Sequence, residues 1–354
     1  MKNIFVLLLV FFILNSFESP NQNQSVIDNY KFKQVLIDTL FQDNISIRAL
    51  VIDENKIWYA ANNSRFGCYD LTKNKRIETS IQKDSLKLEF RSIAKNNSNI
   101  FILNVGNPAL LYKVDKSNLQ TTLVYKETHE KVFYDSLNFW NANEGIAIGD
   151  PTDGTFSIII TRDGGVTWNK QPATDLPKLV EGEAAFAASN TNIVIKGDHT
   201  WLFSGGIKSR VFYSPNKGKT WTVYNTPIVQ GKAMTGIFTA DFYDAKHGFI
   251  AGGDYAILGQ NFGNKARTID GGKTWKLIAE NKGFGYASCV QYIPGSEGKG
   301  IVSVGASGLF YSADSGLNWK QLANDSSLYT LRFIDSNTAI AAGKNKLVRI
   351  KFLK

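Results

Sequence analysis

Apolar residues along this chain fall in short runs, separated by turns rich in glycine, asparagine and aspartate. The runs recur in a fixed order. The first run is apolar, and a turn follows it. The second run consists of small residues and ends in glycine. A third run is followed by a polar turn and then by a fourth, outer run that starts with tryptophan. Short runs bounded by turn residues are typical of β-strands. The pattern predicts an all-β protein built from repeated four-stranded units.

The polar turn is the most regular part of the pattern. Four copies fit S/T-x-D/N-x-G-x-T/N-W, at residues 161–168, 214–221, 268–275 and 312–319. Their tryptophans, at positions 168, 221, 275 and 319, are 53, 54 and 44 residues apart. A repeat of this length is typical of one blade of a β-propeller.

Each residue type in the turn has a structural explanation. A short Asp or Asn side chain accepts hydrogen bonds from turn amides, and glycine supplies the positive φ that such turns need. A tryptophan at the start of the outer strand buries roughly 150–250 Å² between blades. Asn216 replaces aspartate in one copy, which suits a turn but not a catalytic acid. We therefore interpret these residues as structural: Asp163, Trp168, Asn216, Trp221, Asp270, Trp275, Asp314 and Trp319.

Further units, which lack the polar turn, lie before and after the four units that contain it. Residues 47–71 and 90–115 each contain three strands followed by a fourth, whereas Tyr329–Phe352 supplies only three. The missing strand is available in Tyr30–Asp38, and its pairing beside residues 347–352 would remove two open sheet edges. We therefore predict a seven-bladed β-propeller of four-stranded antiparallel blades, closed by an N-terminal strand, as a single domain over residues 30–354.

The chain begins with features of a secretory signal peptide. Lys2 precedes an apolar run from Ile4 to Leu14, which is too short for a bilayer span of about 20 residues. We expect residues 1–19 to be a leader, cleaved after Ser16 or Ser19, and the protein to be periplasmic or secreted. Cys68 and Cys289 fall in blades that are not neighbours, so we expect no disulfide.

Charge and motifs narrow the possible chemistry. The net charge of +9 comes mostly from lysines scattered through turns, which favours anionic partners. The three histidines lack metal-ligand spacing, and no dinucleotide-binding glycine motif leads a strand into a helix. We therefore expect no metal, cofactor or nucleic-acid partner, and we expect a monomer without a membrane span.

The candidate ligand-binding residues lie where strands should meet the central channel. Arg48 and Arg91 each precede an isoleucine by nine residues in equivalent units, and Asp135 and Glu183 fall near that position in the next two. Asp150, Asp153 and Asp254 lie at ends of second strands. These charges either neutralise one another around a wet channel, bind a polar ligand or peptide, or act as paired carboxylates in catalysis.

The polar turn is identified as the Asp-box of BNR-repeat propellers. The chain resembles the photosystem II stability and assembly factor-like family, including exported bacterial relatives sometimes labelled generically as oxidoreductases. The segments that carry the resemblance are Phe133–Trp140, Gly149–Gly154, Gly182–Ser189, Gly252–Tyr255 and Gly285–Val290. The resemblance implies a scaffold that binds or assembles a protein or polar ligand at the channel mouth, with no catalysis.

Sialidases also contain Asp-boxes, and they provide the alternative function. A glycan-active hydrolase of this type would use Asp135, Glu183 or Asp150. The chain lacks the R-I-P motif that sialidases carry near their start, and it offers no clear third arginine beside Arg48 and Arg91. These departures favour the binding scaffold.

Overall fold

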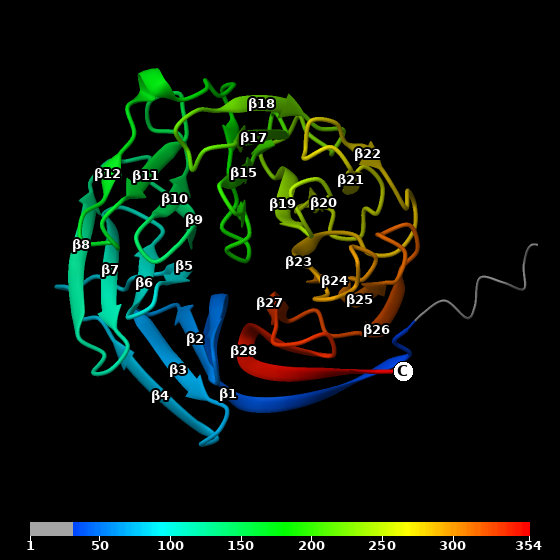
Figure 1. Ribbon diagram of the computed structural model, residues 1–354, viewed down its shortest axis with the longest axis horizontal. Helices are drawn as coiled ribbons and strands as arrows, with labels where there is room; N and C mark the ends of the chain where they lie inside the picture. Colours follow the sequence, from blue (N-terminus) through cyan, green and yellow to red (C-terminus); the bar gives the residue numbers. More distant parts are fainter. Residues whose placement is uncertain (1–30) are drawn as a thin grey trace, which may run out of the picture. The chain divides into compact units, whose positions relative to one another are not determined.

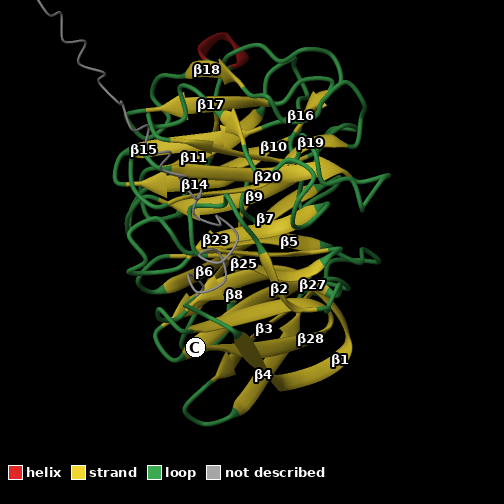
Figure 2. Ribbon diagram, turned by 90° about the vertical axis from the view of Figure 1, so that its right-hand side faces the viewer, coloured by secondary structure: helices red, strands yellow, loops and turns green. Residues whose placement is uncertain are grey.

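Strands make up nearly all the regular structure of residues 31–354, the part of the chain that the computed structural model describes (Figure 1). The proposed leader at residues 1–19 lies outside the described residues. One 3-10 helix, Ala173–Asp175, interrupts the strand pattern. Figure 2 shows the strands in successive layers, with loops along both edges.

Two of the sheets contain six strands each. The first is ordered β27 (Leu328–Phe333), β28 (Thr338–Leu353), β1 (Gln34–Asp53), β2 (Lys56–Ala61), β3 (Arg65–Asp70) and β4 (Lys75–Ser80). The second is ordered β13 (Glu183–Ala184), β16 (Gly205–Gly206), β19 (Thr235–Phe242), β20 (Gly248–Asp254), β21 (Lys265–Thr268) and β22 (Lys276–Leu277).

Four further sheets contain four strands each. One comprises β5 (Phe90–Lys95), β6 (Asn99–Asn104), β7 (Ala109–Asp115) and β8 (Thr121–Glu127). The next comprises β9 (Tyr134–Phe139), β10 (Gly145–Gly149), β11 (Ser157–Thr161) and β12 (Asn169–Lys170). Another comprises β14 (Ile193–Lys196), β15 (His199–Phe203), β17 (Arg210–Ser214) and β18 (Thr222–Asn225). The last comprises β23 (Ala287–Tyr292), β24 (Ile301–Gly305), β25 (Gly308–Ser312) and β26 (Lys320–Ala323).

The sheets form a closed propeller. Figure 1 looks down this ring and shows the sheets arranged around its centre. The innermost strands contact one another in the order β1, β5, β9, β14, β19, β23 and β27, and β27 returns to β1. These strands therefore surround the centre of the ring, and their side chains are available to line it.

The prediction of seven four-stranded blades is wrong, because the strands form six sheets. The outer half of β1 pairs with β28, from Gln34 opposite Leu353 to Gln42 opposite Lys346, and its inner half pairs with β2. Since β1 continues from one pairing to the other, the two ends of the chain and the first predicted blade belong to one sheet. The expected pairing between the chain ends is present within it.

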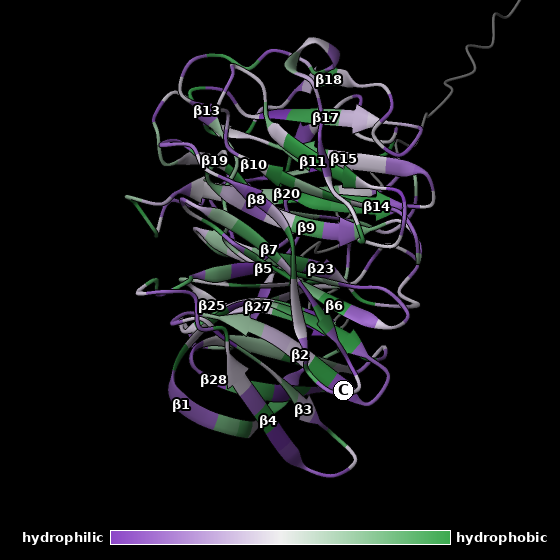
Figure 3. Cartoon of the chain, turned by 90° about the vertical axis from the view of Figure 1, so that its left-hand side faces the viewer, coloured by the Kyte–Doolittle hydropathy of each residue, from purple (hydrophilic) through white to green (hydrophobic). Residues whose placement is uncertain are grey.

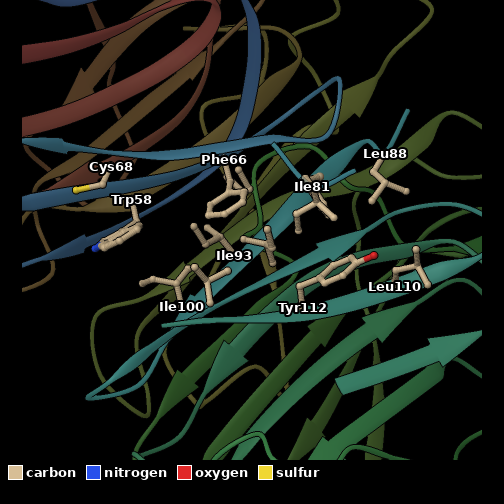
Figure 4. Packing of buried hydrophobic residues seen from close by; sticks show 14 residues of the cluster. Trp58, Phe66, Cys68, Ile81, Leu88, Ile93, Ile100, Leu110 and Tyr112 are labelled. Carbon is tan, nitrogen blue, oxygen red and sulfur yellow. The ribbon is translucent and has the colours of Figure 1, made fainter. Parts of the chain in front are cut away.

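The core lies between neighbouring sheets. Figure 4 shows one such layer, in which Trp58 and Phe66 of the first sheet pack with Ile93, Ile100 and Tyr112 of the β5–β8 sheet. Inner strands such as β6 are buried and apolar, whereas the outer strand β4 is partly exposed and hydrophilic (Figure 3). Apolar burial of this kind stabilises the sheets against one another.

Two further findings concern the cysteines and the helices. Cys68 and Cys289 are buried and unpaired, as their positions predicted. Within residues 31–354, no helix has the length and apolar character needed to cross a bilayer.

The four repeated turns share one hydrogen-bond pattern. In the first copy, Thr161 Oγ1 accepts from the amide of Gly165 at 2.9 Å, and Asp163 Oδ1 accepts from the amide of Thr167 at 3.0 Å. The equivalent bonds recur in the other three copies, with Asn216 in place of aspartate in the second. Gly165 has a φ of 82°, and a Cβ there would lie 2.2 Å from the Phe101 ring. Glycine at this position is therefore required by both backbone and packing.

Candidate functional site

The centre of the ring is crossed by residues 183–192, which we call the central segment. Its residues hydrogen bond to several innermost strands, through the pairs Arg48 Nη1 to Ala188 O (3.3 Å), Asn190 Nδ2 to Ile93 O (2.8 Å), Thr191 Oγ1 to Thr239 Oγ1 (2.9 Å), Ser189 Oγ to Ser288 O (2.6 Å) and Thr330 Oγ1 to Ser189 O (3.2 Å). These partners come from β1, β5, β19, β23 and β27. Residues 184–188 of the central segment line one cavity, and Asn190 and Thr191 line another.

The larger cavity lies on one side of the central segment and has a volume of about 480 Å³. Its floor is formed by Ala184–Ala188 of that segment. Its rim includes Met234 and Tyr255, which are both exposed. The cavity is therefore a pocket with a floor, open to solvent.

Four of the residues predicted for the channel line this pocket: Arg48, Arg91, Asp135 and Asp150. The Arg48 guanidinium lies 4.2 Å from the centre of the Tyr329 ring, and Arg91 Nε donates to Glu89 Oε1 at 3.1 Å. The two arginines are thus held by contacts other than the pocket's aspartates.

The two aspartates differ in their surroundings. Asp135, on β9, is fully buried, and neither of its carboxylate oxygens accepts a hydrogen bond of normal geometry from the described residues, although the amide of Ala187 and the charge of Arg91 both lower its pKa. Asp150 follows β10, and its Oδ1 accepts from the amide of Ala185 at 2.9 Å. Burial raises the pKa of Asp150 to about 6. Burial, followed by the nearby charge of Asp150, raises the pKa of Asp135 well above its usual value.

The other predicted channel residues lie outside the pocket lining. Glu183 is buried, and its two oxygens receive bonds from Arg210 at 2.9 and 2.5 Å, while Ser204 Oγ donates at 2.6 Å. Asp254 is buried beside Lys232, at 3.8 Å, and accepts from the amide of Ala256. Asp153 is exposed on the turn after β10. The carboxylate of Glu183 is therefore neutralised in place by an arginine.

Sequence reasoning missed the aromatic wall of the pocket. Phe186 stacks on Phe238 with ring centroids 3.9 Å apart, and Tyr286 contacts both Phe238 and Tyr255 edge to face. Phe186, Tyr255 and Tyr286 all lie in the segments that carried the family resemblance, Gly182–Ser189, Gly252–Tyr255 and Gly285–Val290. An aromatic residue in each of these three segments could have indicated the pocket wall from the sequence, because the segments otherwise consist mainly of small residues.

A smaller cavity, of about 180 Å³, has a lining that includes Asn190, Thr191, residues 193–196, Asp241 and Arg332. Asp241 Oδ2 accepts from the amide of Tyr292 at 2.7 Å, and Arg332 Nη2 donates to Ser189 O at 3.1 Å. Among residues 31–354, no group of three or more histidine, cysteine or acidic side chains is arranged to hold a metal ion. The groups that the larger pocket offers to a ligand are two guanidinium groups, two carboxyl groups and the aromatic wall.

The aspartates should make stability depend on pH. We expect Asp135→Asn to stabilise the protein by about 1–3 kcal/mol near pH 8, because an unpaired buried carboxylate is costly and asparagine cannot ionise. Since burial raises the pKa of both carboxyls, the wild type is relatively most stable below about pH 4. The part of this stability that Asp150 contributes is lost as pH rises through about 6, and the part from Asp135 is lost as pH rises through its own raised pKa. The gain in the variant should therefore shrink near pH 4.

Urea unfolding at both pH values measures this difference. The titratable or charged side chains that line the pocket are Arg48, Arg91, Asp135, Asp150, Tyr255 and Tyr286. An equal stability difference between variant and wild type at both pH values would contradict the assignment of raised pKa values to these aspartates.

Comparisons with solved structures support the fold. A structure of YCF48 bound to D1 peptide superposes with a TM-score of 0.65 at 14% identity, over 92% of this chain and 98% of that one. YCF48 from Cyanidioschyzon merolae gives 0.63 at 11% identity, over 91% and 99% of the two chains. The WD40 repeats of RRP9 give 0.60 at 12% identity, over 89% and 97%.

No protein-family model matches the sequence, and no curated protein matches it. At identities this low, structural likeness shows the fold alone. Residues 31–354 thus form an all-β propeller that is similar in fold to YCF48.

Proposed function

We propose that this protein is an exported binding or assembly protein that holds a segment of a protein partner in the larger pocket. The observation that carries the proposal is the pocket itself. It has a volume of about 480 Å³ and combines Arg48, Arg91, Asp135 and Asp150 with an aromatic wall. Ligand sites are commonly apolar clefts of about 300–1,000 Å³ with a few convergent polar groups.

The central segment favours a partner that enters from one side. Because Ala184–Ala188 form the floor, a bound chain would insert a terminus or side chains and would not thread the ring. YCF48, which is similar in fold, has been solved with a peptide bound. That likeness supports a polypeptide ligand here. We do not extend it to the D1 peptide itself, because the sequence indicates no photosynthetic context.

Two finer parts of the proposal concern the repeated turns and export. We interpret the turns as Asp-boxes of the BNR type, since their hydrogen bonds close each turn on itself and none of their aspartates lines the pocket. Residues 1–19 are proposed to direct export. Fusion of residues 1–25 to a reporter that is active only outside the cytoplasm tests this, and an inactive fusion would contradict it.

Selection from a random peptide library displayed on phage tests the binding function without a known partner. We expect the wild type to enrich peptides that bind with Kd values of about 1–100 μM. The double variant Arg48→Ala with Arg91→Ala should bind those peptides at least about tenfold more weakly, because it loses two charged contacts of the pocket. Binding should also weaken as salt rises.

Lys219→Ala with Lys273→Ala is the matched control. It removes the same charge from two exposed positions in the repeated turns and should leave peptide binding unchanged. Equal loss in both double variants would mean that net charge, and not the pocket, determines binding. Turnover of a chromogenic glycoside that disappears in Asp135→Asn would replace the proposal with a hydrolase.

A further inference from the structure

Asp135 presents an unusual combination of burial and missing partners. It is fully buried, it lines the pocket, and neither carboxylate oxygen accepts a hydrogen bond of normal geometry within residues 31–354. The amide of Ala187 and the charge of Arg91 lower its pKa without making such a bond, and they do not offset the effect of burial. Buried carboxylates are normally paired or hydrogen bonded, because an unpaired one is strongly destabilising. A cationic group brought by a ligand would supply the missing partner.

The cations of the pocket act on Asp135 only through space: the charge of Arg91 lowers the pKa of Asp135, but neither Arg91 nor Arg48 donates a hydrogen bond to it. Arg91 donates its Nε to Glu89, and Arg48 donates to the carbonyl of Ala188 while lying over the Tyr329 ring. Asp150, the second carboxyl of the pocket, receives one hydrogen bond, from the amide of Ala185, and that bond uses only its Oδ1. Both oxygens of Asp135 and Oδ2 of Asp150 therefore accept no hydrogen bond of normal geometry from the described residues.

The remaining wall suits an organic cation better than a metal ion. Metal sites in proteins usually take several oxygen or nitrogen ligands, and only two carboxylates are present here. The pocket lining also includes Phe186, Phe238, Tyr255 and Tyr286. Aromatic faces attract ammonium groups and cover the alkyl chains that carry them.

We propose that Asp135 and Asp150 together bind the primary ammonium group of a lysine side chain in the partner segment, with its alkyl chain against the aromatic wall. This inference rests on the proposed function, because it assigns a residue type to the segment that the pocket holds. Arg48 and Arg91, on the neighbouring inner strands β1 and β5, remain available for anionic groups elsewhere in that segment.

The first test uses a small probe in place of the unknown partner. Binding of 2-phenylethylammonium and of its neutral analogue 2-phenylethanol to the full chain is measured by ligand-observed NMR. We expect the wild type to bind the ammonium probe at least about tenfold more tightly near pH 8, since charge-assisted hydrogen bonds exceed neutral ones. This preference should fall near pH 5, because Asp150, with its pKa raised to about 6, is then mostly protonated, and the raised pKa of Asp135 acts in the same direction.

Asp135→Asn and Asp150→Asn should each reduce the preference to about twofold or less, without weakening the binding of 2-phenylethanol. Asp241→Asn removes a carboxylate from the smaller cavity and is the matched control, which should keep the full preference. Equal affinity of the wild type for both probes, or a preference that survives in both asparagine variants, would overturn the inference.

A second arm separates the lysine side chain from a free amine. Peptides selected by the pocket should contain lysine, and acetylation of that lysine should weaken their binding at least about tenfold. If pocket-dependent peptides lack lysine, or if acetylation has no effect, the inference fails while the proposed peptide binding stands. If no peptide depends on the pocket, the proposed function itself fails.

Discussion

A chain that begins at Thr39 is expected to lose at least about 3 kcal/mol of unfolding free energy and to aggregate. The truncation removes Phe32, which is 1% exposed and lies 5.2 Å from the Tyr311 ring and 5.4 Å from the Phe352 ring, measured between centroids. It also removes the partners of residues 349–353 on β28. Burial of one phenylalanine alone is worth about 3–5 kcal/mol in truncation experiments, and the exposed edge of β28 would be open to pairing with other chains.

A chain that begins at Lys31 retains every described residue and serves as the control. Urea unfolding measures the stability of both chains, and size-exclusion chromatography with light scattering measures their association. If the shorter chain stays monomeric and unfolds at the same urea concentration, the pairing of residues 34–38 with β28 does not hold the ring closed.

Trp168→Ala is expected to cost about 3–5 kcal/mol, the usual loss for a large buried aromatic side chain. Trp168 is 6% exposed and packs edge to face on Phe101 and Phe139, with centroids 6.1 and 5.7 Å away. These contacts join the repeated turn at residues 161–168 to strands β6 and β9. Thermal and urea unfolding of the variant measure the loss.

Trp221→Ala is the comparison, since Trp221 has the same position in the second repeated turn but is only partly buried. We expect a smaller loss there, because less of this side chain is buried. Unchanged stability in Trp168→Ala would mean that this ring is not a core element and is available to ligands.

The repeat of strand and turn residues predicted the propeller well, because each strand is short and each turn contains residues that need positive φ. It failed on the sheets at the two ends of the chain. Residues 42–46 of β1 and residues 343–346 of β28 contain turn-like residues, and Asn345 has a φ of 66°. In the structure these are irregularities within long strands, which bend without ending, as bulged strands do. Sequence alone does not distinguish such a bend from a turn.

The pocket was predictable only in part. Arg48, Arg91 and Asp135 were found because equivalent positions on successive inner strands face the same channel, and Asp150 because it ends a second strand. Glu183 was misplaced because the central segment precedes the inner strand β14, so distance along the chain does not give the register in that sheet. Its partner Arg210 lies 27 residues away, and no local pattern links the two.

Photo-crosslinking tests the central claim, that the partner segment lies in the larger pocket. Benzoylphenylalanine replaces either Met234, on the rim of the pocket, or Leu317, in the fourth repeated turn; both side chains are 43% exposed. Each protein is irradiated with a peptide selected by the wild type. The account predicts a crosslink at position 234 that is lost when Arg48→Ala and Arg91→Ala are added, and none at position 317. Equal crosslinking at both positions, or crosslinking at 234 that persists in the double variant, would contradict it.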